Sequence, residues 1–305
     1  MTDHLKKYLF ADRSTRAQTV SLENAWRTGL SHQQYPENVQ NLLGELTAAA
    51  VLLAGNLKFE GSLVLQIQGD GPIALLVVEC SSELNIRATV SLRENQSIDA
   101  DASFQQLLNA NGNGRFIVVL DPDSANSDMQ PYQGVVPLEG DTVADVLEDY
   151  MRSSEQLDTK IWLQARNDKA VGLLLQKLPG SGGDQPEVDT EETWQRAKQL
   201  AATIQPEELL AVSPDTLIHR LFWEEDLIAL DGAPVQWHCP CSRERVAKML
   251  NMLGRDEIES ILSERDIIEI SCNFCGKPYE FDAVDCAGLF IDNPDSLQDG
   301  GNTVH

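Results

Sequence analysis

The chain has 305 residues and 42% hydrophobic content, which is enough for two domains with a core. Its 48 acidic residues outnumber its 23 basic residues, and the net charge of −25 repels nucleic acid phosphates. The longest apolar runs, at residues 48–55 and 73–78, fall short of the about 20 residues that span a bilayer. The N-terminus lacks the apolar run of a secretion signal, so we expect a cytoplasmic protein. The acidic charge and the short apolar runs predict that neither nucleic acid nor a membrane is its partner.

The part of the chain before Pro179 has patterns of both strands and helices. Alternating apolar and polar residues predict strands at 62–68, 73–80, 115–120 and 160–165, with a turn at 69–72 between the first two. Helical spacing predicts helices at 37–57 and 142–157, with Asp141 or Thr142 as the N-cap of the second. Because strands come in groups rather than in alternation with helices, the fold class is predicted to be α+β.

A Pro/Gly-rich stretch from Pro179 predicts a domain boundary, so we divide the chain into domains 1–178, 179–231 and 232–305. Residues 179–231, called the linker from here on, carry a net charge of −9. Two helices are predicted within it, at 190–204 and 213–223, with Thr190 and Ser213 as candidate caps. We expect these helices to dock on a hydrophobic face of the first domain and, when released, to bind client proteins, through Trp194, Ala197, Leu200, Ala201, Ile204, Leu217, Leu221 and Phe222.

Five of the six cysteines lie in the last quarter of the chain. A C-x-C pair and a C-x-x-C pair, separated by a helix-sized insert, are typical of four thiolates on one Zn²⁺. The predicted ligands are Cys239, Cys241, Cys272 and Cys275. Four protein ligands leave no open position, which indicates a structural or regulatory metal, one per chain.

Three further residues that could bind a metal are not among the four predicted zinc ligands. Cys80 lies in an apolar strand pattern and is interpreted as a small buried hydrophobe. Cys286 is a spare thiol or an additional candidate ligand, and His238 is expected to be a surface or packing residue. The Gly-Lys-Pro sequence after Cys275 favours a metal-binding turn over the helix that follows a thioredoxin-type pair.

The C-x-C pair also suggests a reversible switch. A disulfide across one intervening residue closes a small ring, so we expect it to be reduced more easily than an ordinary structural bridge. Oxidation would remove the metal ligands, and a zinc domain as small as the one predicted here depends strongly on its metal for folding. Loss of zinc is therefore predicted to unfold residues 232–305.

Several longer motifs resemble one known family. HCPCSRERV at 238–246 and CNFCGKPYEF at 272–281 are preceded by LIHRLFWEEDL, and the first domain contains LQIQGDGPI and GNGRFIVVLDP. Together with PYQGVVPLEGDTVADVLEDYMRSSEQL, these motifs resemble the thirty-three-kilodalton heat-shock chaperonin family, the redox-regulated holdases of bacterial cytosol. The resemblance covers nearly the whole chain.

The resemblance implies an ATP-independent, redox-regulated holdase rather than an enzyme. It implies that oxidants convert Cys239 with Cys241, and Cys272 with Cys275, to disulfides, that zinc leaves, and that the zinc domain and linker unfold. It also implies binding of unfolding client proteins and a homodimer in the active state. Two alternatives remain at this point: a zinc-ribbon protein associated with nucleic acid or translation, which the acidic charge disfavours, and a thiol oxidoreductase.

Overall fold

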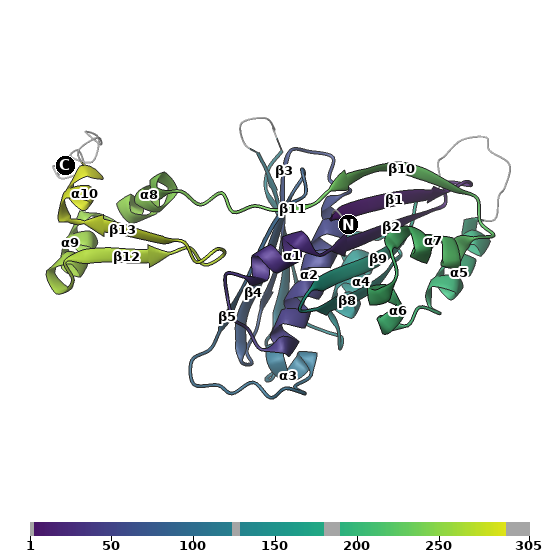
Figure 1. The fold of residues 1–305 in the computed structure, drawn as a ribbon, viewed down its shortest axis with the longest axis horizontal. Coiled ribbons are helices and arrows are strands. Elements are labelled where there is room, and N and C mark those ends of the chain that lie inside the picture. The colour runs from purple at the N-terminus through teal and green to yellow at the C-terminus, as the bar shows by residue number, and fades with distance from the viewer. Residues whose placement is uncertain (1–2, 124–128, 180–189, 291–305) are drawn as a thin grey trace, which may run out of the picture. The chain divides into compact units, whose positions relative to one another are not determined.

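The computed structural model describes residues 3–123, 129–179 and 190–290 (Figure 1). Contacts divide the chain into two units, Met1–His238 and Cys239–His305. The linker helices fall within the first unit, and the four clustered cysteines fall within the second. The predicted α+β class is confirmed, because the first unit combines two sheets with helices.

The first unit contains a five-stranded and a six-stranded sheet (Figure 1). In spatial order the five-stranded sheet consists of β10 (Leu227–Pro234), β1 (His4–Phe10), β2 (Thr15–Leu22), β9 (Lys169–Lys177) and β8 (Thr159–Arg166). The six-stranded sheet consists of β11 (Gln236–Trp237), β5 (Asn85–Leu92), β4 (Ile73–Ser81), β3 (Gly61–Gln68), β6 (Arg115–Pro122) and β7 (Tyr132–Pro137). Neighbouring strands are antiparallel except β11 and β5, which are parallel. The four strands predicted from alternation are β3, β4, β6 and β8, and all four are confirmed.

Helix α2 (Glu37–Ala54) packs against strands of both sheets. It is apolar around most of its circumference, and 11 of its 18 residues are buried, as expected of a helix inside a core. At Gly44 a Cβ atom would lie 2.4 Å from the Cβ of Ala165 on β8. Glycine at this position therefore allows the helix to approach the edge strand closely.

The remaining helices of the first unit lie on the sheets or in the linker. They are α1 (Asn24–Leu30), α3 (Phe104–Leu108), α4 (Val143–Ser153), α5 (Thr190–Ala201), α6 (Pro206–Ala211) and α7 (Pro214–Phe222). Thr142 is the N-cap of α4, since its side chain accepts a hydrogen bond from Asp145 N, and Ser213 caps α7 in the same way through Thr216 N. The predicted cap at Thr190 lies outside the side chains that the structure describes.

Strand β9 is buried on both faces. Ala170 and Leu174 belong to the core around α2, whereas Val171, Leu173 and Leu175 face a second hydrophobic cluster shared with the linker helices. Because both faces are apolar, β9 lacks the alternation that reveals a half-buried strand. This explains why residues 169–177 were not predicted from the sequence.

The second unit has a small core. Its described elements are α8 (Arg243–Leu253), α9 (Arg255–Glu264), the antiparallel pair β12 (Ile267–Ser271) and β13 (Pro278–Asp282), and α10 (Ala283–Gly288) (Figure 1). Six buried side chains form its hydrophobic cluster: Leu250, Ile258, Ile268, Tyr279, Phe281 and Cys286. Among the described helices of both units, none has the length and apolarity required to cross a membrane.

Candidate metal centre

Cys239 and Cys241 lie immediately before helix α8. Ser242 is the N-cap of α8, and its hydroxyl accepts a hydrogen bond from Arg245 N at 3.3 Å. Because the cap follows Cys241 directly, the start of the helix fixes the direction in which the chain leaves the first pair. The C-x-C sequence thus forms a short turn at the base of the helix.

Cys272 and Cys275 lie in the turn that joins β12 to β13. Gly276 N donates to Cys272 O at 2.8 Å, and Cys272 N donates to Lys277 O at 3.0 Å. Gly276 has a φ of +66°, in the left-handed region that favours glycine. The chain continues as strand β13 from Pro278 rather than as a helix. This local structure agrees with the prediction of a metal-binding turn after Cys275.

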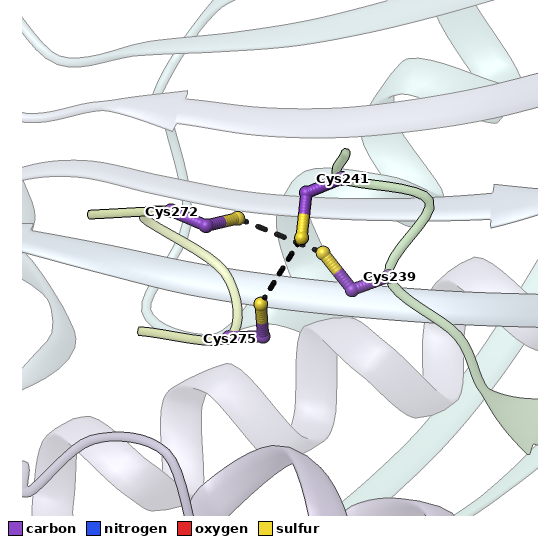
Figure 2. Close-up of side chains that lie close together, drawn as sticks. All are labelled: Cys239, Cys241, Cys272 and Cys275. Atoms are coloured by element: carbon purple, nitrogen blue, oxygen red, sulfur yellow. Dashed lines mark hydrogen bonds between the residues drawn. The ribbon is translucent and has the colours of Figure 1, made fainter. Parts of the chain in front are cut away.

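The two turns bring the four thiols together (Figure 2). All four sulfur atoms lie within 4.8 Å of one another, with 3.6 Å between Cys239 Sγ and Cys272 Sγ and 3.4 Å between Cys241 Sγ and Cys275 Sγ. A disulfide requires about 2.05 Å, whereas a tetrahedral site with Zn–S bonds of about 2.3 Å separates its sulfurs by about 3.8 Å. The observed separations therefore fit one shared metal ion and not disulfides.

The thiols differ in their electrostatic surroundings. Burial raises the pKa of Cys241, but the nearby Tyr279 hydroxyl and the neighbouring thiols outweigh burial and lower this pKa to about 7. Burial and the neighbouring thiols raise the pKa of Cys275 to about 12, and burial raises that of Cys239. Closely spaced thiolates repel one another, so a divalent cation is the natural partner for four of them.

Tyr279 provides a further sign that a thiolate belongs at this position. Its side chain is 6% exposed, and its hydroxyl has no hydrogen-bond partner among the described residues. The neighbouring Cys241 sulfur raises the pKa of Tyr279. A buried hydroxyl beside a sulfur is typical of the groups that surround metal-bound thiolates. The residues present therefore fit a metal held by four thiolates.

Arg243 joins the two halves of this unit. It donates to Glu280 O on β13, forms an ion pair with Asp285 at 2.7 Å, and lies over the Phe281 ring at 4.2 Å from its centroid. Because Arg243 begins α8 two residues after Cys241, these contacts hold the first cysteine turn against the strand that follows the second. Neither Arg243 nor Tyr279 was predicted, because their contacts depend on the register of β13.

The other predicted candidates lie outside this cluster. Cys80 on β4 is fully buried, and burial raises the pKa of its thiol far above the usual range. Cys286 on α10 is 2% exposed and belongs to the small core of the second unit. His238 donates its backbone N–H to Ile86 O at 3.0 Å and is not part of the group of four. Of the described residues, these four cysteines form the one group of three or more potential metal ligands.

The linker helices pack on the face of the five-stranded sheet opposite α2. Six of the predicted linker residues are buried there, and two are partly buried: Trp194, Ala197, Ala201, Ile204, Leu217 and Phe222, with Leu200 and Leu221. Their partners on the sheet include Phe10, whose ring meets that of Phe222 edge-on at 5.4 Å. The predicted stripe therefore has a partner in this structure, while its role with client proteins stays a prediction.

Polar contacts that the sequence did not reveal also hold the linker. Lys6 and the Tyr8 hydroxyl both bond to Asp215 at the start of α7. Lys177 pairs with Glu191 on α5, and Lys169 Nζ donates to Leu210 O at 2.9 Å. Basic groups of the sheet thus contact acidic or carbonyl groups of the linker at several points.

Comparison with known proteins identifies the family. The sequence model of the family described as "Hsp33 protein" matches residues 3–282. The chain belongs to the Hsp33 family. Hsp33 relatives named "33 kDa chaperonin" include those of Methylobacillus flagellatus, 44% identical over 95% of each chain, and Ectopseudomonas mendocina, 42% identical over 95% of this chain and 96% of the relative. The family resemblance inferred from the sequence is therefore confirmed, and the family is one of chaperones.

A solved Hsp33 structure has the same fold. The crystal structure of the 33 kDa chaperonin from Thermotoga maritima aligns with a TM-score of 0.75 and covers 94% of this chain and 97% of its own. The two sequences are 21% identical, so this likeness establishes the shared fold alone.

Proposed function

We propose that the chain is a redox-regulated, ATP-independent holdase whose switch is a zinc centre. The observation that carries the proposal is the gathering of four thiols within 4.8 Å, together with membership of a chaperone family. Cys239, Cys241, Cys272 and Cys275 would hold one Zn²⁺, which prefers four thiolates in closed tetrahedral sites. When bound, zinc supplies folding energy and keeps the thiolates deprotonated.

The proposed switch is oxidation of the four thiolates. Two thiolates lose two electrons to form one S–S bond, and hydrogen peroxide takes up these electrons with two protons to give two molecules of water. Two peroxide molecules thus convert the four thiolates to two disulfides. A disulfide sulfur is a poor metal ligand, so the chain can no longer hold the ion.

We take the disulfide pairing from the family resemblance: Cys239 with Cys241, and Cys272 with Cys275. The closest sulfur contacts run across the two turns, between Cys239 and Cys272 and between Cys241 and Cys275. Pairing within each turn therefore requires the sulfurs to leave these cross-turn contacts during oxidation, which all four can do because they lie within 4.8 Å of one another. Peptide mapping of the oxidised protein distinguishes the two patterns, and bonds across the turns would contradict this step.

Loss of the metal should unfold the second unit. Structural zinc contributes about 10–16 kcal/mol in small zinc domains. The hydrophobic cluster of this unit contains six buried side chains among the described residues, which is too few to replace that contribution.

Release of the linker would then expose client-binding surface. Undocking of α5–α7 uncovers both the linker stripe and the sheet face around Phe10 and Leu173. The net charge of −9 on the linker would keep a complex with an unfolding protein in solution. We also propose, from the resemblance, that the oxidised form is a homodimer, that the protein acts in the cytoplasm, and that it has no enzymatic activity.

One experiment tests the proposal as a whole. Zinc release and suppression of aggregation of a thermally unfolded protein are measured before and after peroxide treatment with mild heating. We expect zinc loss and holding activity to appear together, and to be reversed by reductant and zinc. A reduced, zinc-bound protein that is already fully active, or an oxidised one that is inactive, would contradict the redox switch.

A further inference from the structure

Glu45 of α2 is an unpaired carboxyl beside edge strand β8 of the five-stranded sheet, in a cavity that linker residues also line. It is half-buried, and no hydrogen bond or ion pair joins it to any other described residue. Together with residues of three other elements, it lines a cavity of about 190 Å³ at the edge strand β8. A charged side chain without a partner in such a cavity disfavours the packing of the segments that form the cavity walls.

The other walls of this cavity carry no titratable group. They are Thr142 and Ala144 at the start of α4, Ile161–Gln164 on β8, and Ile204, Pro206 and Leu209 of the linker. Charged side chains of the same elements lie outside the lining: Glu37, Asp145, Glu148, Asp149, Arg152, Lys160, Arg166, Glu207 and Glu208. Several of them have partners of their own, such as Glu148 with Lys160 and Glu208 with Arg220.

The surroundings of this carboxyl favour its protonated form. Partial removal from water disfavours a charged group, and the cavity lining contains no basic side chain that would offset this cost. The cavity is therefore suited to a neutral Glu45.

We propose that Glu45 is a proton-dependent latch for the linker, so that docking of α6 weakens as Glu45 ionises. The linker supplies one wall of the cavity through Leu209, which is 4% exposed. When α6 leaves, the half-buried carboxyl becomes more exposed to water, which stabilises its charged form. Acidity thus strengthens docking, and a shift toward alkaline pH loosens the linker without oxidation.

The expected pH window follows from the two states of the linker. Burial raises the pKa of Glu45 from its ordinary value of 4.5 to about 8 in the docked state. The contribution of Glu45 to the stability of linker docking is fully present below the pKa that Glu45 has in the undocked state. This contribution is lost as the pH rises toward the pKa of Glu45 in the docked state. Since one proton is released, the opening equilibrium rises by at most tenfold per pH unit, and it levels off above about pH 8.

Hydrogen exchange of residues 206–211 in the reduced, zinc-loaded protein tests the latch. Opening equilibria, corrected for intrinsic exchange, are compared between pH 6 and pH 8.5 for the wild type, Glu45→Gln and the exposed control Glu207→Gln. We expect opening to increase with pH in the wild type and in Glu207→Gln. In Glu45→Gln, the factor by which the opening equilibrium rises per pH unit should be at least threefold smaller than in the wild type. Equal pH dependence in all three proteins would overturn the proposal.

A second measurement does not depend on the glutamine variant folding. The Glu45 carboxyl is titrated by carbon NMR in the wild type and in Leu209→Ala, which removes part of the linker wall. We expect an elevated apparent pKa that moves toward 4.5 in Leu209→Ala. An unshifted pKa in the wild type, or one that the variant leaves unchanged, would contradict the latch. Although its consequence for activity rests on the proposed lock role of the linker, both measurements observe docking itself and can fail independently of chaperone function.

Discussion

Each unit of this Hsp33 chain buries one cysteine that lies outside the metal cluster, but the two hydrophobic cores differ greatly in size. Cys80 belongs to a cluster of 42 buried residues between two sheets and α2, whereas Cys286 belongs to a cluster of six, counted over the described residues. A large core stabilises its fold without help, while a small core requires a further cross-link such as a metal. The comparison explains why the proposed redox switch in the second unit would unfold that unit and leave the large core of the first unit folded.

The largest effect is expected from removing the metal ligands. Replacing all four clustered cysteines by serine should abolish zinc binding and remove about 10 kcal/mol or more from the stability of the second unit. The core of the first unit around α2 should remain folded, because it contains none of these residues. Zinc content and hydrogen exchange of each unit check this. Protected amides throughout residues 243–288 in the variant would show that the second unit does not need its metal.

The next effect concerns the linker. Trp194 is 3% exposed, so Trp194→Asp should cost docking about 3–5 kcal/mol and give holding activity to the reduced, zinc-loaded protein. Leu200→Asp should act in the same direction but less strongly, since Leu200 is only partly buried. Trp223→Asp is the matched control, because Trp223 lies in the same linker and is 68% exposed. Aggregation assays compare the three. If the linker opens in Trp194→Asp by hydrogen exchange but no holding activity appears, the linker is not the lock.

A smaller effect is expected at Arg243, which joins α8 to β13 and α10. Arg243→Ala loses the bond to Glu280 O, the pair with Asp285 and the contact with Phe281, and should destabilise the second unit by about 1–2 kcal/mol. We expect faster zinc transfer to a chelator in this variant. Arg245→Ala, on an exposed neighbour of the same helix, should leave the rate unchanged. Equal rates in both variants would assign the stability of this unit to the metal alone.

The smallest effect belongs to the ion pair of Lys6 with Asp215. Both side chains are substantially exposed, so Lys6→Ala should weaken docking of α7 by about 0.5–1 kcal/mol, and added salt should reduce this difference. Lys58→Ala provides an exposed control on the same unit. Hydrogen exchange of residues 214–222 at low and high salt measures the effect. A difference that grows with salt would exclude an electrostatic origin.

Much of the site was predictable because its signals are local in sequence. The spacing of the two cysteine pairs by itself predicts a metal site, and the glycine after Cys275 indicates the turn that the structure has. The stripe on the linker helices is likewise visible as a helical period. For such features the sequence neighbours of a residue are also its structural neighbours.

Other features depend on pairing between distant segments and could not be predicted. Strand β1 pairs with β10, which comes after the linker helices in the sequence, and the adjacent Lys6 and Lys7 interrupt the apolar–polar alternation of residues 4–10. The position of Tyr279 beside Cys241 requires the register of β12 with β13, and the cavity beside Glu45 requires α6 to pack on β8. These relations arise from tertiary packing, which composition and periodicity do not encode.

The different reactivity of Cys286 and Cys80 tests the central claim most directly. The native protein is exposed to an alkylating reagent before and after peroxide treatment with mild heating, and modification of each cysteine is measured by mass spectrometry. We predict that both are protected in the reduced protein, and that after zinc loss Cys286 becomes modified at the rate of an exposed thiol while Cys80 stays protected. Continued protection of Cys286 after both disulfides have formed, or equal modification of Cys80, would contradict selective unfolding of the second unit.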